Sequence, residues 1–107
     1  MAKKFGEHIK ELRQKNKLLQ REVASQLDMD TPLLSKIERG ERMPKKEMVS
    51  RMAQILKADE KELLTLWLAD QLYDMAKDED VAVKAMQVAE KNIKYSSRKK
   101  NPKSNKK

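Results

Sequence analysis

Between Thr31 and Arg39 the sequence carries side chains suited to hydrogen bonding with a nucleic acid. Leu34 and Ile37 are spaced to point into a protein core, which leaves five other side chains on the opposite side of a helix. Arginine and lysine donate to guanine edges, serine and threonine donate or accept, and proline offers an apolar surface to a thymine methyl group. The candidates for contact with DNA are therefore Thr31, Pro32, Ser35, Lys36 and Arg39.

Three more basic side chains follow this helix, where the backbone of a bound DNA would pass. Arg42, Lys45 and Lys46 are suited to holding phosphate groups, which position a protein on DNA without reading its sequence. Lys36 and Arg39 could also bind phosphate instead of a base. The sequence leaves that choice open.

The residues around the helix define where it begins and ends. Asp30 or Thr31 can cap its first turn, where Pro32 is tolerated because it has no amide hydrogen to leave unpaired. Gly40 is typical of a helix end, and Pro44 prevents continuation. An apolar helix with Val23 and Leu27 precedes it, and the sharp turn between the two falls at Asp28, a residue type that tolerates a left-handed conformation.

Apolar residues recur at helical spacing along most of the chain, and no stretch alternates with period two. The breaks between the apolar stripes predict helices at about 5–16, 20–27, 31–39 and 45–57. Asp59 and Glu62 form a capping box for a fifth helix to about residue 77, and the acidic residues 78–80 favour the start of a sixth. We therefore expect an all-α protein.

Composition excludes several kinds of site. The 107 residues suffice for one small domain, cysteine is absent, and the single histidine, His8, has no second candidate ligand nearby, so we expect no metal and no cofactor. Ser35 has no histidine or lysine base at a credible spacing, so we expect no enzyme activity. No signal peptide or membrane span is visible, which predicts a cytoplasmic protein with no membrane partner.

The net charge of +8 is unevenly distributed. Residues 1–57 carry 14 Lys/Arg and 8 Asp/Glu, a net +6, whereas residues 58–90 carry 3 and 9, a net −6. Residues 91–107 carry eight basic residues and no acidic ones. A basic first half suits a polyanionic partner, and the acidic segment should face away from it.

The stretches FGEHIKELR, QREVA and LLSKIERGERMP together resemble the Cro and phage-repressor-like helix-turn-helix family, often called the XRE family. The resemblance covers about residues 5–64. It implies a five-helix lambda-repressor-like DNA-binding domain over 1–64, with the helix-turn-helix at 20–39 and helix 31–39 in the major groove. It also implies that Gln20 faces the phosphate backbone and that Arg13 and Glu38 form a structural ion pair.

Two positions depart from the family pattern. Members usually have Ser or Thr just before the glutamine that opens the second helix, and a glycine before that; here these positions are Leu19 and Lys17. The missing side-chain cap would cost about 1 kcal/mol and puts one phosphate contact in doubt. Asp28 replaces the usual turn glycine.

Beyond the resemblance, residues 65–95 predict a helical extension, and 96–107 predict a basic disordered tail without an apolar residue. The extension adds more apolar surface than two helices can hide from each other, so we expect it to dimerise the protein on a palindromic site in double-stranded DNA. Folding of the sixth helix onto the fifth is the alternative. The expected interface consists of Leu64, Trp67, Leu68, Leu72, Met75, Met86 and Ile93.

Taken together, the residues and the resemblance predict a dimeric transcriptional regulator that represses its own or neighbouring promoters. One alternative is an antitoxin-type module in which residues 58–95 bind a protein partner and DNA binding is secondary. Another is an RNA-binding protein, suggested by the basic tail. The RNA alternative lacks exposed aromatic residues for base stacking, since Trp67 and Tyr73 are expected to be buried.

Overall fold

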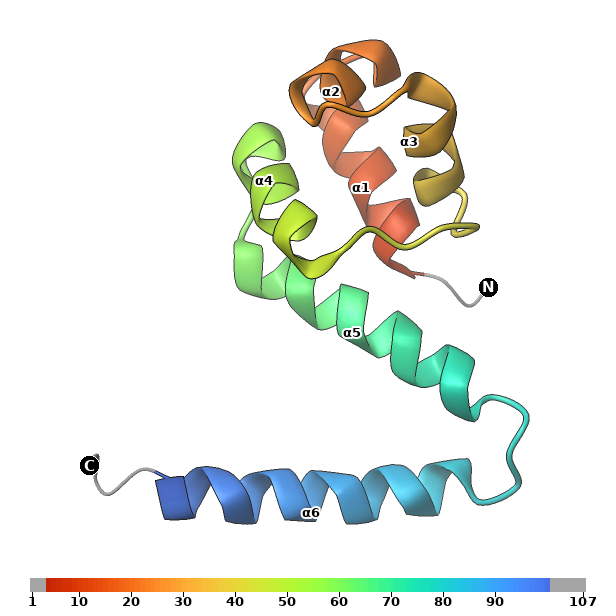
Figure 1. Ribbon diagram of the computed structural model, residues 1–107, viewed down its shortest axis with the longest axis vertical. Helices are drawn as coiled ribbons and strands as arrows, with labels where there is room; N and C mark the ends of the chain where they lie inside the picture. Colours follow the sequence, from red (N-terminus) through yellow and green to blue (C-terminus); the bar gives the residue numbers. More distant parts are fainter. Residues whose placement is uncertain (1–3, 101–107) are drawn as a thin grey trace. The chain divides into compact units, whose positions relative to one another are not determined.

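The computed structural model describes residues 4–100, which contain six α-helices and no strand (Figure 1). The helices α1 to α6 span Lys4–Lys15, Gln20–Gln26, Thr31–Glu38, Lys46–Leu56, Glu60–Ala76 and Ala82–Lys100. The all-α prediction is confirmed for these residues, and the first five helices agree with the predicted bounds to within one residue. None of the described helices has the length and hydropathy that crossing a membrane requires.

The chain divides into two compact units, residues 1–74 and 75–107. The division falls near the end of α5, about ten residues later than the boundary at 64 that the sequence suggests. Most of α5 is therefore part of the first unit.

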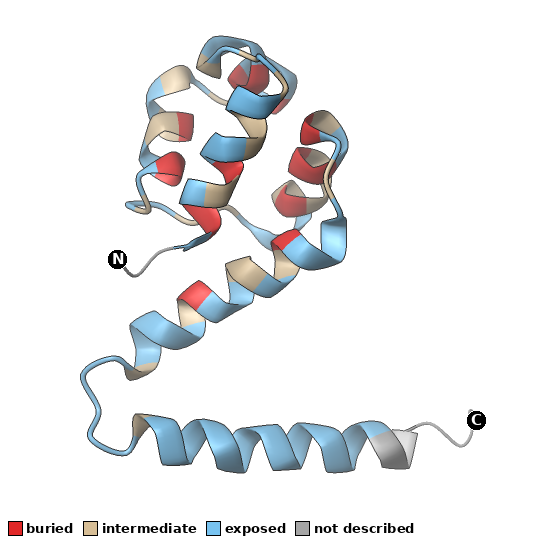
Figure 2. Cartoon of the chain, turned by 180° about the vertical axis from the view of Figure 1, so that it is seen from behind, coloured by how far each residue is buried: buried red, intermediate tan, exposed pale blue. Residues whose placement is uncertain are grey.

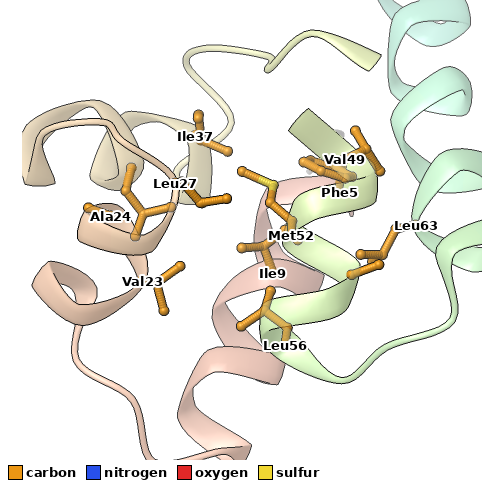
Figure 3. Packing of buried hydrophobic residues seen from close by; sticks show 12 residues of the cluster. Phe5, Ile9, Val23, Ala24, Leu27, Ile37, Val49, Met52, Leu56 and Leu63 are labelled. Atoms are coloured by element: carbon orange, nitrogen blue, oxygen red, sulfur yellow. The ribbon is translucent and has the colours of Figure 1, made fainter. Parts of the chain in front are cut away.

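The core of the first unit collects apolar side chains from all five of its helices. Figure 3 shows Ile9 of α1, Met52 and Leu56 of α4 and Leu63 of α5 close together, with residues of α2 alongside. The complete set of buried apolar residues is Phe5, Ile9, Val23, Ala24, Leu27, Leu34, Ile37, Val49, Met52, Ala53, Leu56 and Leu63. In Figure 2 the buried positions of α1 to α4 lie on the sides that face one another.

Four of the helices end at a residue in the left-handed conformation. These residues are Lys17, Asp28, Gly40 and Lys57, with φ of 59°, 56°, 81° and 56°. Each end carries the pair of backbone hydrogen bonds that terminates a helix at such a residue; after α4, for example, the amide of Ala58 donates to the Ala53 carbonyl at 2.9 Å. The left-handed conformation predicted for Asp28 is confirmed, and three of the four ends use a residue with a side chain.

α5 caps the first turn of α1. Asp70 is only 2% exposed, and its carboxylate accepts hydrogen bonds from the backbone amides of Lys4 at 2.9 Å and Phe5 at 2.8 Å. These are amides that have no partner within their own helix. A carboxylate at a helix N-terminus is also favoured by the helix dipole, so Asp70 attaches α5 to the start of the chain.

α1 approaches the end of α3 closely at Gly6. A Cβ atom at this position would lie 2.3 Å from the backbone oxygen of Ile37 and 2.7 Å from that of Glu38. Both distances are shorter than atoms can adopt without movement of the backbone. The contact therefore requires glycine, and it fixes where α3 ends relative to α1.

In the second unit, α6 is a single helix of 19 residues. Apart from Ala82, its described side chains are exposed (Figure 2). The helix runs to Lys100, five residues into the segment expected to be disordered, and residues 101–107 of that segment lie outside the described residues. Arg98, Lys99 and Lys100 have good helix propensity and favour a helix C-terminus, whereas Pro102 disfavours continuation.

Candidate nucleic-acid interface

Both ends of α3 are fixed by hydrogen bonds. The Asp30 carboxylate accepts from the Leu33 amide at 2.9 Å, so Asp30 is the capping residue of the two that the sequence allowed. At the other end the Gly40 amide donates to the Ile37 carbonyl at 3.0 Å, and the Glu41 amide donates to the Lys36 carbonyl at 2.9 Å. This pair of bonds, with Gly40 in the left-handed conformation, terminates the helix.

The start of α2 lacks a capping side chain, as predicted. Leu19 holds the N-cap position and has no side-chain acceptor, but the Glu22 carboxylate accepts from the Leu19 amide at 2.7 Å. Half of a capping box is therefore present and satisfies one backbone donor of this turn.

A network of hydrogen-bonded polar side chains around the buried Glu38 joins α1, α2 and α3. The Arg13 guanidinium donates to the Glu38 carboxylate from Nε at 2.6 Å and from Nη2 at 3.1 Å, and the Glu38 side chain is only 2% exposed. The Gln20 amide donates to the same carboxylate at 2.9 Å, and Arg13 also donates to the Leu18 carbonyl at 2.9 Å. The network sets the position of α3 relative to the first two helices.

Gln20 has a hydrogen-bond partner within the protein, in addition to the DNA backbone that the resemblance implies. The resemblance assigns its side chain to the DNA backbone, whereas here the side-chain amide is bonded to Glu38 and is half-buried. The carbonyl oxygen and the second N–H of that amide are not used in this bond.

The face of α3 opposite Leu34 and Ile37 carries the predicted contact residues. Pro32, Lys36 and Arg39 are exposed, and Thr31 and Ser35 are half-buried. A hollow of about 300 Å³ lies beside this face and is lined by Asp30, Pro32, Leu33, Lys36 and Arg42. The structure thus brings Pro32 and Lys36 of the helix face together with Arg42 of the following loop.

Arg39 is engaged by its neighbours. Its guanidinium donates to the Glu41 carboxylate from Nε at 2.9 Å and from Nη2 at 3.2 Å, and Nη1 donates to the Ser35 hydroxyl. The hydrogen bond with Arg39 lowers the pKa of Glu41, and the same bond raises the pKa of Arg39. Because both side chains are 54% exposed, a phosphate could displace Glu41 at little expense in free energy.

Arg42, Lys45 and Lys46 lie on the loop after α3 and at the start of α4. All three are exposed, and none of their side chains forms a hydrogen bond or ion pair with another described residue. Their charges are therefore available to an anionic partner.

Sequence reasoning missed three features near this interface. The sequence analysis assigns no role to Glu41, although it lies two positions after Arg39 and this spacing was a signal for an ion pair. The capping role of Asp70 could not be predicted, because no local pattern links it to Lys4, 66 positions away. A pocket of about 320 Å³ between α3 and α4 also has no sequence signal, because its lining comes from four separate segments.

The residues predicted for a dimer interface fall into two groups. Leu64 and Trp67 are half-buried against the core, and the Trp67 indole donates to the Pro44 carbonyl at 2.8 Å. The remaining five are exposed within the described chain: Leu68, Leu72, Met75, Met86 and Ile93. The burial expected for Trp67 is partial, and Tyr73 is 43% exposed rather than buried.

His8 lies between two carboxylates, with Nδ1 3.9 Å from Glu11 and Nε2 4.0 Å from Glu62. Asp59 caps α5 by accepting from the Lys61 amide at 3.1 Å. The second half of the predicted capping box is not formed, because the Glu62 carboxylate lies near His8 instead of accepting from the Asp59 amide. Among residues 4–100, no three side chains of the types that ligate metals are grouped closely enough to hold an ion.

Comparison with known proteins agrees with this geometry. Residues 4–66, more than half of the 107, match a family model described as a helix-turn-helix domain. No curated protein and no solved structure matches the chain significantly. The matched range begins with α1 and ends within α5, before Asp70.

Proposed function

The chain belongs to the helix-turn-helix domain family, and from this premise we propose that it is a sequence-specific regulator that binds double-stranded DNA with α3 in the major groove. The observation that carries the proposal is the outer face of α3. Its polar side chains are presented by a helix whose two ends and inner face are all fixed by other parts of the domain. A rigid helix of this kind can hold side chains against base edges.

The proposed roles follow from exposure and chemistry. Lys36 and Arg39 donate to base edges or phosphates, while Thr31, Pro32 and Ser35 contact base edges in the same major groove. Arg42, Lys45 and Lys46 hold the phosphate backbone, aided by the free donor of Gln20. The ion pair of Arg13 and Glu38 is structural. An XRE-type, lambda-repressor-like arrangement of the five helices is part of the same proposal.

We further propose that the protein is a homodimer on a palindromic operator and represses its own or neighbouring promoters by occupying them. No catalytic step is involved, and a cytoplasmic location follows because the DNA lies there. The exposed apolar residues of α5 and α6, from Leu68 to Ile93, support dimerisation. The same exposed residues favour the alternative of an antitoxin-type module with a protein partner.

Selection of binding sites from random duplexes tests DNA recognition. Fluorescence anisotropy then compares the double variant Lys36→Ala/Arg39→Ala with the parent on a selected site and on random DNA. Loss of about 100-fold on the selected site and much less on random DNA is expected if these side chains read bases, since a good base contact contributes about 1–3 kcal/mol. Lys10→Ala, at an exposed position of α1, is the control.

Other outcomes are equally informative. Equal losses on both duplexes would show that Lys36 and Arg39 bind only backbone, and absence of any selected site would refute sequence-specific recognition. A single replacement by alanine at Arg42, Lys45 or Lys46 should make the plot of log affinity against log salt concentration less steep. The expected reduction in slope is about 0.9, the contribution of one phosphate contact.

Light scattering of the purified protein tests the dimer. Ile93→Glu should convert a dimer to a monomer, because it buries an unpaired charge in the proposed apolar interface. Lys84→Glu places the same charge on the same helix outside that stripe and should leave the dimer intact. A monomeric parent protein would refute dimerisation and leave the interaction of α6 with another protein as the alternative.

A further inference from the structure

The pocket between α3 and α4 has an apolar interior that takes no part in the proposed DNA contacts. It has a volume of about 320 Å³, and its apolar lining includes Met29, Leu33, Met43 and Met48. Ligand sites commonly have volumes of about 300–1,000 Å³, so this pocket suits a small molecule rather than a large cofactor.

The apolar lining is unusual because three of its side chains are methionines. Met29 follows α2, Met43 lies in the loop after α3, and Met48 is in the first turn of α4. All three are half-buried and lie against the core. Methionine is unbranched and polarisable, so such a lining can adapt to ligands of different shapes.

The rim of the pocket is basic. Arg42, Lys45 and Arg51 line it, with Glu47 as the single acidic residue. Arg51 is committed elsewhere, since it donates to the Gln26 carbonyl at 2.9 Å and to the Asp28 carboxylate at 3.2 Å. Arg42 and Lys45 form no such bond with another described residue, and they leave an excess of positive charge at the mouth of an apolar pocket.

We propose that this pocket binds a small amphipathic organic anion, with a short apolar body among the methionines and a carboxylate held by Arg42 and Lys45. Burial of the apolar body provides most of the affinity. The charge-assisted hydrogen bonds of the carboxylate orient the ligand and distinguish it from a neutral one of the same size.

A consequence for DNA binding follows, and it rests on the proposed function. Arg42 and Lys45 are also the proposed phosphate ligands, so the organic anion and DNA require the same two cations. Binding of either should weaken binding of the other by the same factor, because coupling between two sites is reciprocal. The ligand would then act as an inducer that releases the operator.

The methionines provide a direct test with octanoate as the probe. The sequence has seven methionines, and ¹³C-methyl NMR can follow each one during a titration below the concentration at which octanoate forms micelles. We expect saturable shifts at Met29, Met43 and Met48. Met75, which is 77% exposed, and Met86 lie outside the pocket and should not respond.

Variants test the role of charge. Arg42→Gln/Lys45→Gln should weaken octanoate binding by about tenfold or more, because weaker neutral hydrogen bonds replace both charge-assisted ones. Lys10→Gln, an exposed substitution on α1, should have no effect. Binding of 1-octanol to the parent should be about as weak as binding of octanoate to the double variant. The methyl spectrum shows at the same time that each variant is folded.

Absence of shifts at Met29, Met43 and Met48, or equal shifts at Met75 and Met86, would overturn the proposal. So would equal binding of octanoate to the double variant and the parent. Addition of random duplex DNA should raise the octanoate concentration needed for half-saturation. If DNA does not bind at all, the proposed function fails, while the methyl shifts still decide whether the pocket binds an anion.

Discussion

α3 and α6 both expose side chains to the solvent, but they differ in what stabilises them. α3 has eight residues and is held by a capping carboxylate, a left-handed glycine and three buried side chains, Leu34, Ile37 and Glu38. α6 has 19 residues and buries none of its described side chains. Isolated helices shorter than about 12–15 residues are marginal in water, so α3 depends on its tertiary contacts, whereas the length of α6 favours a helix by itself.

This difference separates two kinds of exposed surface. The outer face of α3 is rigid because both ends of the helix are capped and its inner side chains are packed in the core. A rigid face suits recognition of a rigid duplex. The apolar side chains of α6 are not covered by the unit to which they belong, which suits association with another polypeptide. Four substitutions test this comparison.

Removal of the buried carboxylate should have the largest effect. Glu38→Ala leaves Arg13 as an unpaired charge with a side chain only 11% exposed, and we expect a loss of about 3 kcal/mol in the free energy of unfolding. Urea denaturation followed by circular dichroism measures the loss. Glu41→Ala removes a carboxylate from an exposed ion pair with Arg39 and should leave the unfolding free energy almost unchanged. Similar losses for Glu38→Ala and Glu41→Ala would show that the buried carboxylate under α3 stabilises the protein no more than an exposed one, which would contradict the comparison.

Gly6→Ala should come next. The added Cβ would collide with two backbone oxygens at the end of α3, and overpacking of this kind costs about 1–3 kcal/mol. Thermal unfolding measures the change, and affinity for DNA should fall as α3 moves. Ala85→Gly in α6 is the contrasting change, because it should lower helicity without shifting the main unfolding transition. A Gly6→Ala protein as stable as the parent would contradict the close approach.

Asp70→Ala should have an intermediate effect. It leaves the amides of Lys4 and Phe5 without their acceptor, and loss of a helix cap costs about 0.5–2 kcal/mol. Asp78→Ala, an exposed substitution between α5 and α6, should change the denaturation midpoint very little. Hydrogen exchange at Phe5 gives a local measurement, and exchange no faster than in the parent would show that the cap contributes nothing.

Lys17→Gly should have the smallest effect and the opposite sign. Lys17 adopts a φ of 59°, which costs a residue with a Cβ about 1–2 kcal/mol and costs glycine little. Allowing for the greater chain entropy of glycine in the unfolded state, we expect a gain of about 0.5 kcal/mol. Lys10→Gly, the same substitution within α1, should instead destabilise by about 1 kcal/mol. Destabilisation by both would refute the conformational explanation.

The sequence predicted well what is decided locally. The helices, the cap of α3, for which the sequence allowed Asp30 or Thr31, and the left-handed turn at Asp28 each depend on residues within four positions of one another. The proximity of Arg13 and Glu38 was accessible only through the family resemblance, because they are 25 positions apart in the sequence.

Features that depend on distant segments were not predictable. The pocket draws its lining from the turn after α2, α3, the following loop and α4, and its volume depends on how these pack. The sequence predicted the boundary of the first domain at residue 64, whereas the first compact unit extends to residue 74. The contact of Asp70 with the first turn of α1 holds this part of α5 to the unit, and it joins residues 65 positions apart, which leaves no local signal in the sequence.

The contact of Asp70 with the first turn of α1 has a kinetic consequence. Its hydrogen bonds join residues 65 and 66 positions apart, so they require α1 and α5 to be placed already by the intervening helices. Contacts of such long range close a large loop and are expected to form after the transition state for folding. Asp70 should therefore act mainly on the lifetime of the folded domain: loss of its carboxylate speeds unfolding while the folding rate stays nearly the same.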